Sequence, residues 1–149
     1  MMKFVHTIEN LITRCVPAWL TSLILRFGVA IPFWKSGLTK WDGFGVLSET
    51  PVILFENEFL LHIFGKEYSF PFPTFMAYAS SIGEIILPIL VVLGLFTRFA
   101  ALGLLFMTLI IQLTFLDAWP LHLTWAAMAI GIIHLGGSRL SLDSLLLKR

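Results

Sequence analysis

The sequence predicts an all-α integral membrane protein. It is expected to be a bundle of four transmembrane helices with both termini in the cytoplasm and short interfacial helices between the first and second spans. Apolar residues make up 58% of the 149 positions and charged residues only 13%, too few charges to cover a soluble chain of this length. Four apolar stretches approach or reach the length that crosses a bilayer. Basic residues gather at alternate ends of these stretches, which is typical of a multi-pass protein.

The four spans are expected to form a single transmembrane domain over residues 1–149. A hydrocarbon core about 30 Å thick requires about 20 predominantly apolar helical residues. The last stretch is the shortest, so we expect it to cross with little tilt or to thin the bilayer locally. The predicted spans are residues 17–39, 75–95, 99–116 and 121–137.

The distribution of charge predicts the orientation of the bundle. Lysine and arginine are enriched in the cytoplasmic flanks of transmembrane helices. One end of the predicted bundle holds Lys3, Arg14, Arg98, Arg139, Lys148 and Arg149. The opposite end holds the acidic residues between spans one and two and the turn between spans three and four. We therefore predict that residues 40–73 lie on the outer side of the membrane.

The outer segment 40–73 is amphipathic. Residues 46–64 mix aliphatic and aromatic side chains with scattered acids and Pro51, a stretch too short and too charged to span a bilayer. It is therefore predicted to form one or two short helices that lie in the interface or cap the bundle. Pro71 and Pro73 predict an extended approach to the second span.

Two ionisable residues fall within predicted spans at similar depth. Arg26 lies in the first span and Glu84 in the second, and charge at membrane depth is costly enough to require an explanation. Opposite signs at one level predict a buried Arg26–Glu84 ion pair. This pair either fixes which helices touch or takes part directly in ligand, proton or electron chemistry.

A second polar group gathers toward the outer half of the bundle. Its members are candidates for the walls of an outward-facing, aromatic pocket suited to a quinone or a similar flat molecule. An aromatic belt at the membrane surface, with lysine snorkelling outward, explains the same residues without a ligand. The candidate ligand-binding residues are Lys35, Lys40, Gln112, Asp117, Trp119 and His122.

Several other classes of site receive no support from the sequence. The single cysteine, Cys15, excludes an internal disulfide and a CxxC redox pair. The four histidines are scattered without metal-ligand spacing, so no metal site is predicted. No basic run accompanies the net charge of +1, so we expect no nucleic-acid partner.

Three sequence stretches have a recognisable pattern. They are residues 25–30 with Phe33, Gly37 and Lys40, residues 93–101 with Glu84, and residues 136–143. Together they resemble the DoxX-like family of small inner-membrane proteins. The ending GGSRLSLD keeps the family pattern except at Gly137, where a proline is common. The outer segment resembles a subgroup found beside enzymes that modify copper-inducible peptides.

The resemblance implies a four-helix bundle in the bacterial inner membrane. Members have been linked to quinone-coupled oxidation of thiosulfate, to oxidoreductase complexes, and to oxidative or metal stress. The positions carried over are Arg26, Lys40, Glu84 and Arg98. The resemblance therefore adds an expectation of redox function that the residues alone do not specify.

Three functions remain open on the sequence. The leading hypothesis is a membrane component of an oxidoreductase or stress-response system that binds quinone. The second is a non-enzymatic binder or transporter of a small molecule, metal complex or peptide. The third is a scaffold that holds a soluble or peptide partner on the outer side. In each case membrane lipid is a partner, and a homo-oligomer remains open.

Overall fold

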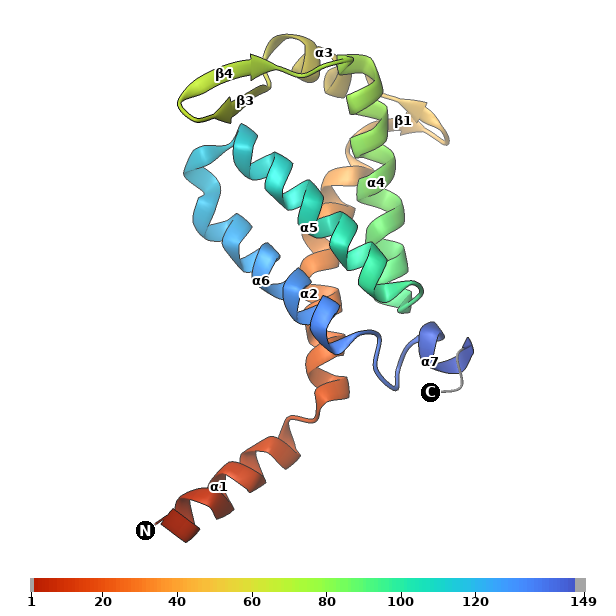
Figure 1. The fold of residues 1–149 in the computed structure, drawn as a ribbon. Coiled ribbons are helices and arrows are strands. Elements are labelled where there is room, and N and C mark those ends of the chain that lie inside the picture. Colours follow the sequence, from red (N-terminus) through yellow and green to blue (C-terminus); the bar gives the residue numbers. More distant parts are fainter. Residues whose placement is uncertain (1, 147–149) are drawn as a thin grey trace.

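A computed structural model describes residues 2–146 of the chain, which are mostly helical (Figure 1). Lys148 and Arg149, which contribute to the predicted cytoplasmic charge, lie outside the described residues. Four long helices form the bundle, and a smaller layer covers one end of it. The bundle helices are α2 (Ala18–Leu38), α4 (Pro73–Leu93), α5 (Thr97–Thr114) and α6 (Trp119–Leu135), with the 3-10 turn η1 (Leu116–Ala118) before α6.

The bundle packs around one apolar core. α2 packs against α4 and α6, while α5 packs against α6 and α4. The buried residues of this core come from all four helices, with small alanines of α5 among them. They are Val29, Phe33, Val91, Ala100, Ala101, Leu104 and Ile132.

The helix ends follow from proline and glycine. Pro73 and Pro120 stand in the first turns of α4 and α6, where a missing backbone N–H costs nothing. Gly94 ends α4 in the left-handed conformation, with φ at +69°, which glycine adopts without steric cost.

Within the described part of the chain, three helices are long and apolar enough to cross a membrane: residues Pro73–Leu93, Thr97–Thr114 and Leu116–Leu135. They correspond to predicted spans two, three and four, with starts that differ by two to five residues. The helix α2 has a comparable length of 21 residues, but Arg26 and Lys35 lower its apolar character. Its crossing of the membrane stays a prediction.

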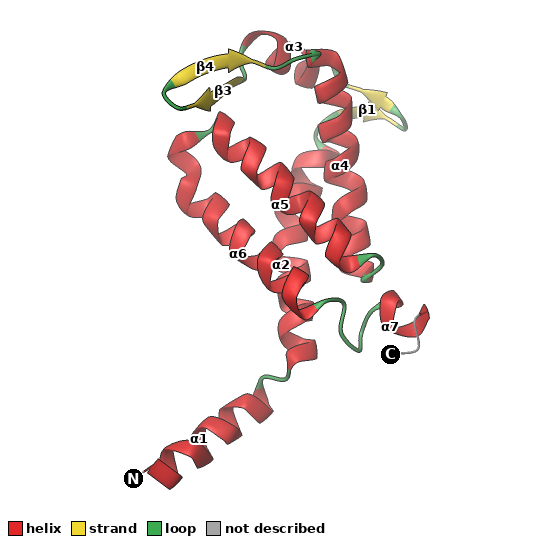
Figure 2. Ribbon diagram, viewed as in Figure 1, coloured by secondary structure: helices red, strands yellow, loops and turns green. Residues whose placement is uncertain are grey.

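The outer segment differs from its prediction. Instead of helices alone, it contains one helix, α3 (Glu49–Asn57), between two antiparallel hairpins (Figure 2). The hairpins are β1 (Trp41–Gly43) with β2 (Val46–Leu47), and β3 (Leu60–Ile63) with β4 (Lys66–Ser69). Gly45 and Gly65 have φ near +75° at the two turns, the conformation that tight hairpin turns require. We call residues 40–72 the cap.

The cap packs onto the bundle through its own apolar cluster. Leu47, Phe55 and Phe70 are buried against Ala77 of α4. Trp41, Leu61 and Ile110 of α5 pack around them. Both hairpins are therefore anchored beside the first turns of α4 and the last turns of α5.

Two helices lie outside the bundle at its other end. The first, α1 (Met2–Cys15), extends away from the bundle (Figure 1). The second, α7 (Leu142–Leu146), belongs to residues 136–146, which we call the tail and which return beneath α4 and α5. Val5, Leu11 and Ile12 are exposed on α1. Neither helix was predicted, because α1 is short and amphipathic and α7 has only five residues.

Candidate functional site

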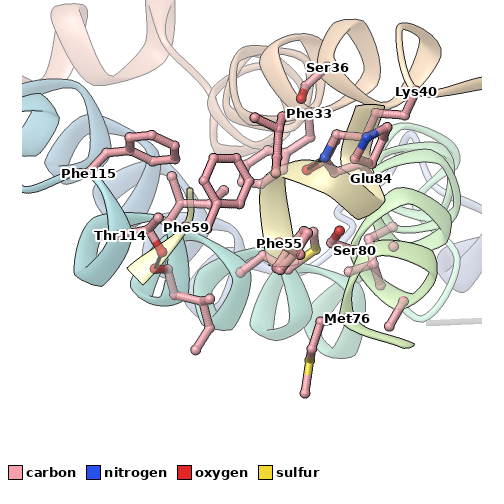
Figure 3. A pocket seen from close by; sticks show the side chains of 18 of the residues that line it. Phe33, Ser36, Lys40, Phe55, Phe59, Met76, Ser80, Glu84, Thr114 and Phe115 are labelled. Atoms are coloured by element: carbon pink, nitrogen blue, oxygen red, sulfur yellow. Dashed lines mark hydrogen bonds and ion pairs between the residues drawn. The ribbon is translucent and has the colours of Figure 1, made fainter. Parts of the chain in front are cut away.

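A cavity of about 680 Å³ lies between the cap and the outer half of the bundle (Figure 3). Its walls come from α2, α4 and α5, with Trp125 of α6, and its roof comes from α3 and other residues of the cap. Most of the lining is apolar, with seven aromatic side chains: Phe33, Phe55, Phe59, Phe70, Phe106, Phe115 and Trp125. This volume falls within the range of small-molecule sites, roughly 300–1,000 Å³.

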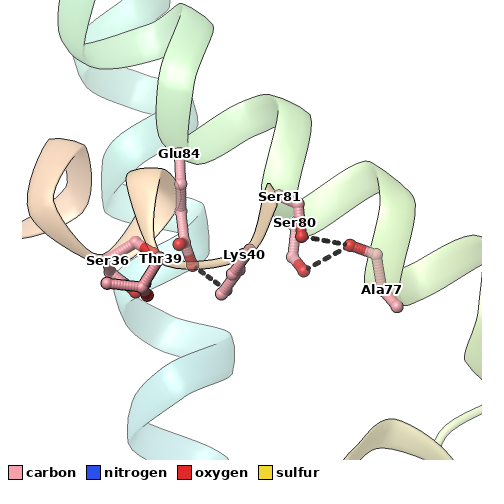
Figure 4. Close-up of polar contacts among 7 residues, drawn as sticks. All are labelled: Ser36, Thr39, Lys40, Ala77, Ser80, Ser81 and Glu84. Atoms are coloured by element: carbon pink, nitrogen blue, oxygen red, sulfur yellow. Dashed lines mark hydrogen bonds and ion pairs between the residues drawn. The ribbon is translucent and has the colours of Figure 1, made fainter. Parts of the chain in front are cut away.

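One ion pair stands in this apolar wall. The Lys40 ammonium donates to Glu84 Oε1 at 2.7 Å (Figure 4). The Glu84 side chain is 5% exposed and the Lys40 side chain 21%. The second carboxylate oxygen, Glu84 Oε2, is buried and has no hydrogen-bond partner. Buried acceptors usually have a hydrogen-bond partner, and this oxygen is free to accept a hydrogen bond from a bound molecule.

Local packing brings the two charges together. α2 ends at Leu38, and Lys40 follows with its backbone N–H bonded to Gly37 O. A Cβ added at Gly37 would lie 3.0 Å from the backbone oxygen of Glu84. Since only a small residue permits this approach, Gly37 sets the distance between α2 and α4 at the level of the pair.

Arg26 does not pair with Glu84, so the predicted Arg26–Glu84 ion pair is wrong. Arg26 is 1% exposed and donates to Val91 O at 2.7 Å and to Val92 O at the end of α4. It also donates to Gly137 O at 3.1 Å and Leu140 O at 2.7 Å in the tail. The error lies in the assumed depth, because Arg26 is level with the last turn of α4 and Glu84 is near its middle.

The terminal carbonyls of α4 explain this placement. The last carbonyls of a helix lack intrahelical donors and carry partial negative charge. A guanidinium offers five N–H donors and can satisfy several carbonyls at once. Arg26 is therefore a structural clamp between α2, α4 and the tail.

Hydroxyl groups supply the remaining polar surface of the cavity. Thr39 Oγ1 donates to Ser36 O at 2.8 Å, Ser80 Oγ to Ala77 O at 3.1 Å, and Thr114 Oγ1 to Ile110 O at 3.0 Å. Since each proton is used within its own helix, each oxygen remains available as an acceptor. Lys40 supplies the charged donor in the lining, and Glu84 Oε2 the charged acceptor.

Of the six predicted ligand-binding residues, Lys40 lines this cavity. Gln112 and His122 form a separate pair, with His122 Nδ1 2.8 Å from Gln112 Oε1. His122 also packs its ring 5.2 Å from Trp125, which does line the cavity. Lys35, Asp117 and Trp119 are exposed and lie outside the lining.

The sequence reasoning missed most of the cavity wall. Ser36, Ser80 and the cap phenylalanines were not singled out as ligand-binding residues. Ser36 stands four residues before Lys40 in sequence, and that helical spacing was a usable signal. The cap phenylalanines gave none, because their contacts depend on the fold of the cap.

A carboxylate at the opposite end caps a bundle helix. Asp143 accepts hydrogen bonds from the backbone N–H groups of Phe96 at 2.8 Å and Thr97 at 2.9 Å, and from Thr97 Oγ1 at 2.7 Å. Partial burial alone would raise the pKa of Asp143. The three hydrogen bonds and the charge of Arg26 outweigh it and hold that pKa below its usual value.

No group of three or more histidine, cysteine, aspartate or glutamate side chains is arranged to hold a metal ion among residues 2–146.

The DoxX family domain matches residues 21–117. The chain belongs to the DoxX family. The DoxX match includes α2, the cap, α4 and α5, and therefore Arg26, Lys40 and Glu84. A protein of Haemophilus influenzae described as uncharacterized is 30% identical over 142 residues, covering 85% of this chain and 83% of its own. No solved structure matches the chain. With its three long apolar helices, this DoxX protein is a membrane protein.

Proposed function

We propose that this DoxX protein binds a quinone, or a similar flat apolar redox molecule, in the cavity beneath the cap. The observation that carries the proposal is the Lys40–Glu84 pair in an aromatic cavity, with Glu84 Oε2 buried and unpaired. A ligand that supplies one hydrogen-bond donor would satisfy this oxygen. The same ligand would fill an apolar volume that is otherwise costly to leave empty.

The chemistry of a quinone matches both charged groups. The oxidised ring has carbonyl oxygens that accept hydrogen bonds from an ammonium such as Lys40. The reduced ring has hydroxyl groups that donate to a carboxylate oxygen such as Glu84 Oε2. Phe33, Phe55 and Phe59 offer aromatic faces and edges to a planar ring.

The proposed role is that of a component within a larger oxidoreductase or stress-response system. The sequence has one cysteine, so it offers no thiol pair as an electron carrier. A bound organic molecule carries the electrons, and a partner subunit exchanges them with it. We place the protein in the bacterial inner membrane with α2 as a fourth crossing, both termini cytoplasmic and the cap outside.

Quinone content and quinone binding test the proposal. The full-length protein, extracted in mild detergent, is expected to carry quinone detectable by mass spectrometry. After removal of that quinone, a short-chain quinone is expected to quench tryptophan fluorescence saturably, because Trp125 lines the cavity. An empty protein without affinity for added quinones would overturn the proposal.

Matched phenylalanine substitutions locate the binding site. Ser80→Phe places a ring in the cavity and is expected to abolish quinone binding. Leu102→Phe adds the same ring at a lipid-facing position that is 54% exposed, and is expected to leave binding unchanged. Equal quinone binding by both variants would show that quinone does not bind in this cavity. Retention of a non-redox apolar molecule in place of quinone would favour the binder or transporter hypothesis.

A further inference from the structure

The two hairpins of the cap each carry a fully exposed phenylalanine at the turn. Phe44 follows β1 and is 109% exposed relative to a reference residue, and Phe64 follows β3 and is 102% exposed. Each is followed by a glycine with φ near +75°. A Cβ added at Gly45 or Gly65 would meet no atom within 4 Å, so neither tip packs against the protein.

The hairpins are rooted at the level where the apolar helices begin and end. Trp41 and Leu47 pack with Ala77, which lies within the apolar stretch Pro73–Leu93. His62 Nδ1 lies 3.1 Å from Leu113 O, next to the end of the apolar stretch Thr97–Thr114. Both tips therefore start from the boundary between the hydrocarbon core and the outer headgroups.

The two tips point away from each other. The hairpin β1–β2 extends beyond α4 on one side of the cap, and β3–β4 extends past the ends of α5 and α6 on the other (Figure 1). A bilayer surrounds the bundle on both sides and can receive both tips. A single protein partner would have to reach around the cap to contact both.

We infer that Phe44 and Phe64 insert into the outer leaflet and anchor the cap to the membrane at two opposite points. The partner of each tip is the lipid: the phenylalanine ring enters the interfacial region of the bilayer, where aromatic rings are favoured. Each tip presents one ring rather than a broad patch, which fits lipid better than a protein interface of ordinary size. Polar neighbours, Asp42 and Lys66, lie two residues from Phe44 and Phe64, so that hydrated headgroups can surround each tip above the inserted ring.

Site-specific fluorophores test this inference on the full chain. Cys15→Ser removes the natural thiol, and Phe44→Cys, Phe64→Cys or Glu49→Cys then carries an environment-sensitive label. Glu49 is the matched control, because it is exposed on the cap but lies in the first turn of α3. The labelled proteins are measured in liposomes of phosphatidylethanolamine and phosphatidylglycerol and in native membranes.

Lipid anchoring predicts a clear pattern. Labels at positions 44 and 64 are expected to be quenched by spin-labelled lipid and to be about fivefold less accessible to iodide than the label at 49. Iodide access at 44 and 64 equal to that at 49 in both preparations would overturn the inference. Protection in native membranes but not in liposomes would also overturn it, and would indicate a protein partner instead.

Discussion

At the scale of single residues, Lys40 and Glu84 are unequally buried. The Glu84 side chain is 5% exposed, whereas the Lys40 side chain is 21% exposed and can turn toward water. Removing one partner of a buried ion pair is costly chiefly because the other charge stays buried. The two single variants should therefore differ in stability.

We expect Lys40→Met to be the more damaging change. It leaves the Glu84 carboxylate buried without a partner, and should lower the free energy of unfolding by about 3 kcal/mol. Glu84→Gln leaves only the partly exposed ammonium and should cost about 1 kcal/mol or less. Unfolding in detergent followed by circular dichroism measures both.

The double variant Lys40→Met/Glu84→Gln provides the control. Because it removes both charges, it should be more stable than Lys40→Met alone. If the double variant is as unstable as the sum of the single variants, the two residues are not coupled, and the ion pair does not explain their effects.

Asp143 predicts a pH dependence of stability. Its pKa is lower in the folded protein than the usual 3.8, so the folded state holds its proton less tightly than the unfolded state. Its contribution is fully present above pH 3.8 and is lost as the pH falls through the lower folded pKa. Asp143→Asn should remove this contribution, at a cost of about 1 kcal/mol at neutral pH.

Thermal unfolding of the wild type and of Asp143→Asn over a descending pH series measures this effect. The two midpoints should differ at neutral pH and converge under acid conditions, where Asp143 of the wild type takes up a proton. A constant separation over the whole series would show that protonation of Asp143 does not control the difference.

The sequence identified the important charges but not all of their partners. Arg26 and Glu84 stand out because charge is rare in apolar helices. Their partners depend on the offset between α2 and α4, which no residue pattern encodes. Lys40 appeared as a candidate ligand residue, but its bond to Glu84 requires the close approach at Gly37.

At the scale of elements, the connection between α4 and α5 depends on Gly94. Its φ is +69°, and a Cβ there would lie 2.4 Å from Ser141 Cβ and 2.7 Å from Arg26 Nη2. Gly65 has a φ of +75° but nothing within 4 Å of an added Cβ. A substitution at Gly65 therefore introduces backbone strain alone, whereas a substitution at Gly94 introduces both backbone strain and steric overlap.

We expect Gly94→Ala to destabilise the protein at least about twice as much as Gly65→Ala. The second substitution should cost roughly 1–2 kcal/mol through backbone strain alone. The first adds overpacking against the tail and the Arg26 clamp. Detergent unfolding of both variants measures the difference, and equal losses would contradict the role assigned to this packing.

The cap shows what residue patterns predict and where they stop. Its length and charges predicted a segment with one or two short helices, and one such helix is present as α3. The hairpins were missed because their strands have two to four residues, too few for an alternating pattern to be distinctive. The residues of the cavity roof were not predicted, because they belong to this segment and their contacts depend on its fold.

At the scale of the whole molecule, the crossing of α2 decides the topology. If α2 crosses, Cys15 and the cap lie on opposite sides of the membrane, and the predicted orientation puts Cys15 in the cytoplasm and the cap outside. Cys15 is exposed and therefore reports its own location. Glu67→Cys in a Cys15→Ser background reports the location of the cap.

We expect a membrane-impermeant maleimide to label Glu67→Cys in intact spheroplasts. The wild-type Cys15 should react only after permeabilisation. Labelling of Cys15 in intact spheroplasts would place it on the same side as the cap, and the four-crossing arrangement would be wrong.

The membrane class and the three most apolar helices were predictable from composition and length alone. The first bundle helix was also predicted, since α2 runs over nearly the predicted range. Its charges lower its apolar character, so its crossing of the membrane requires an experimental test. The clamp and the helix cap made by the tail were not predictable. They join residues more than forty positions apart through backbone groups, which carry no sequence signal.

The Arg26 clamp has a consequence for the order of events during protein synthesis. Two of its acceptors, Gly137 O and Leu140 O, are 111 and 114 positions later in the chain. At roughly 5–20 residues per second, the ribosome makes them on the order of ten seconds after Arg26. Until then the guanidinium has only the carbonyls at the end of α4. α2 and α4 can therefore make contact early in synthesis, but the full set of Arg26 hydrogen bonds forms only after the tail has been translated.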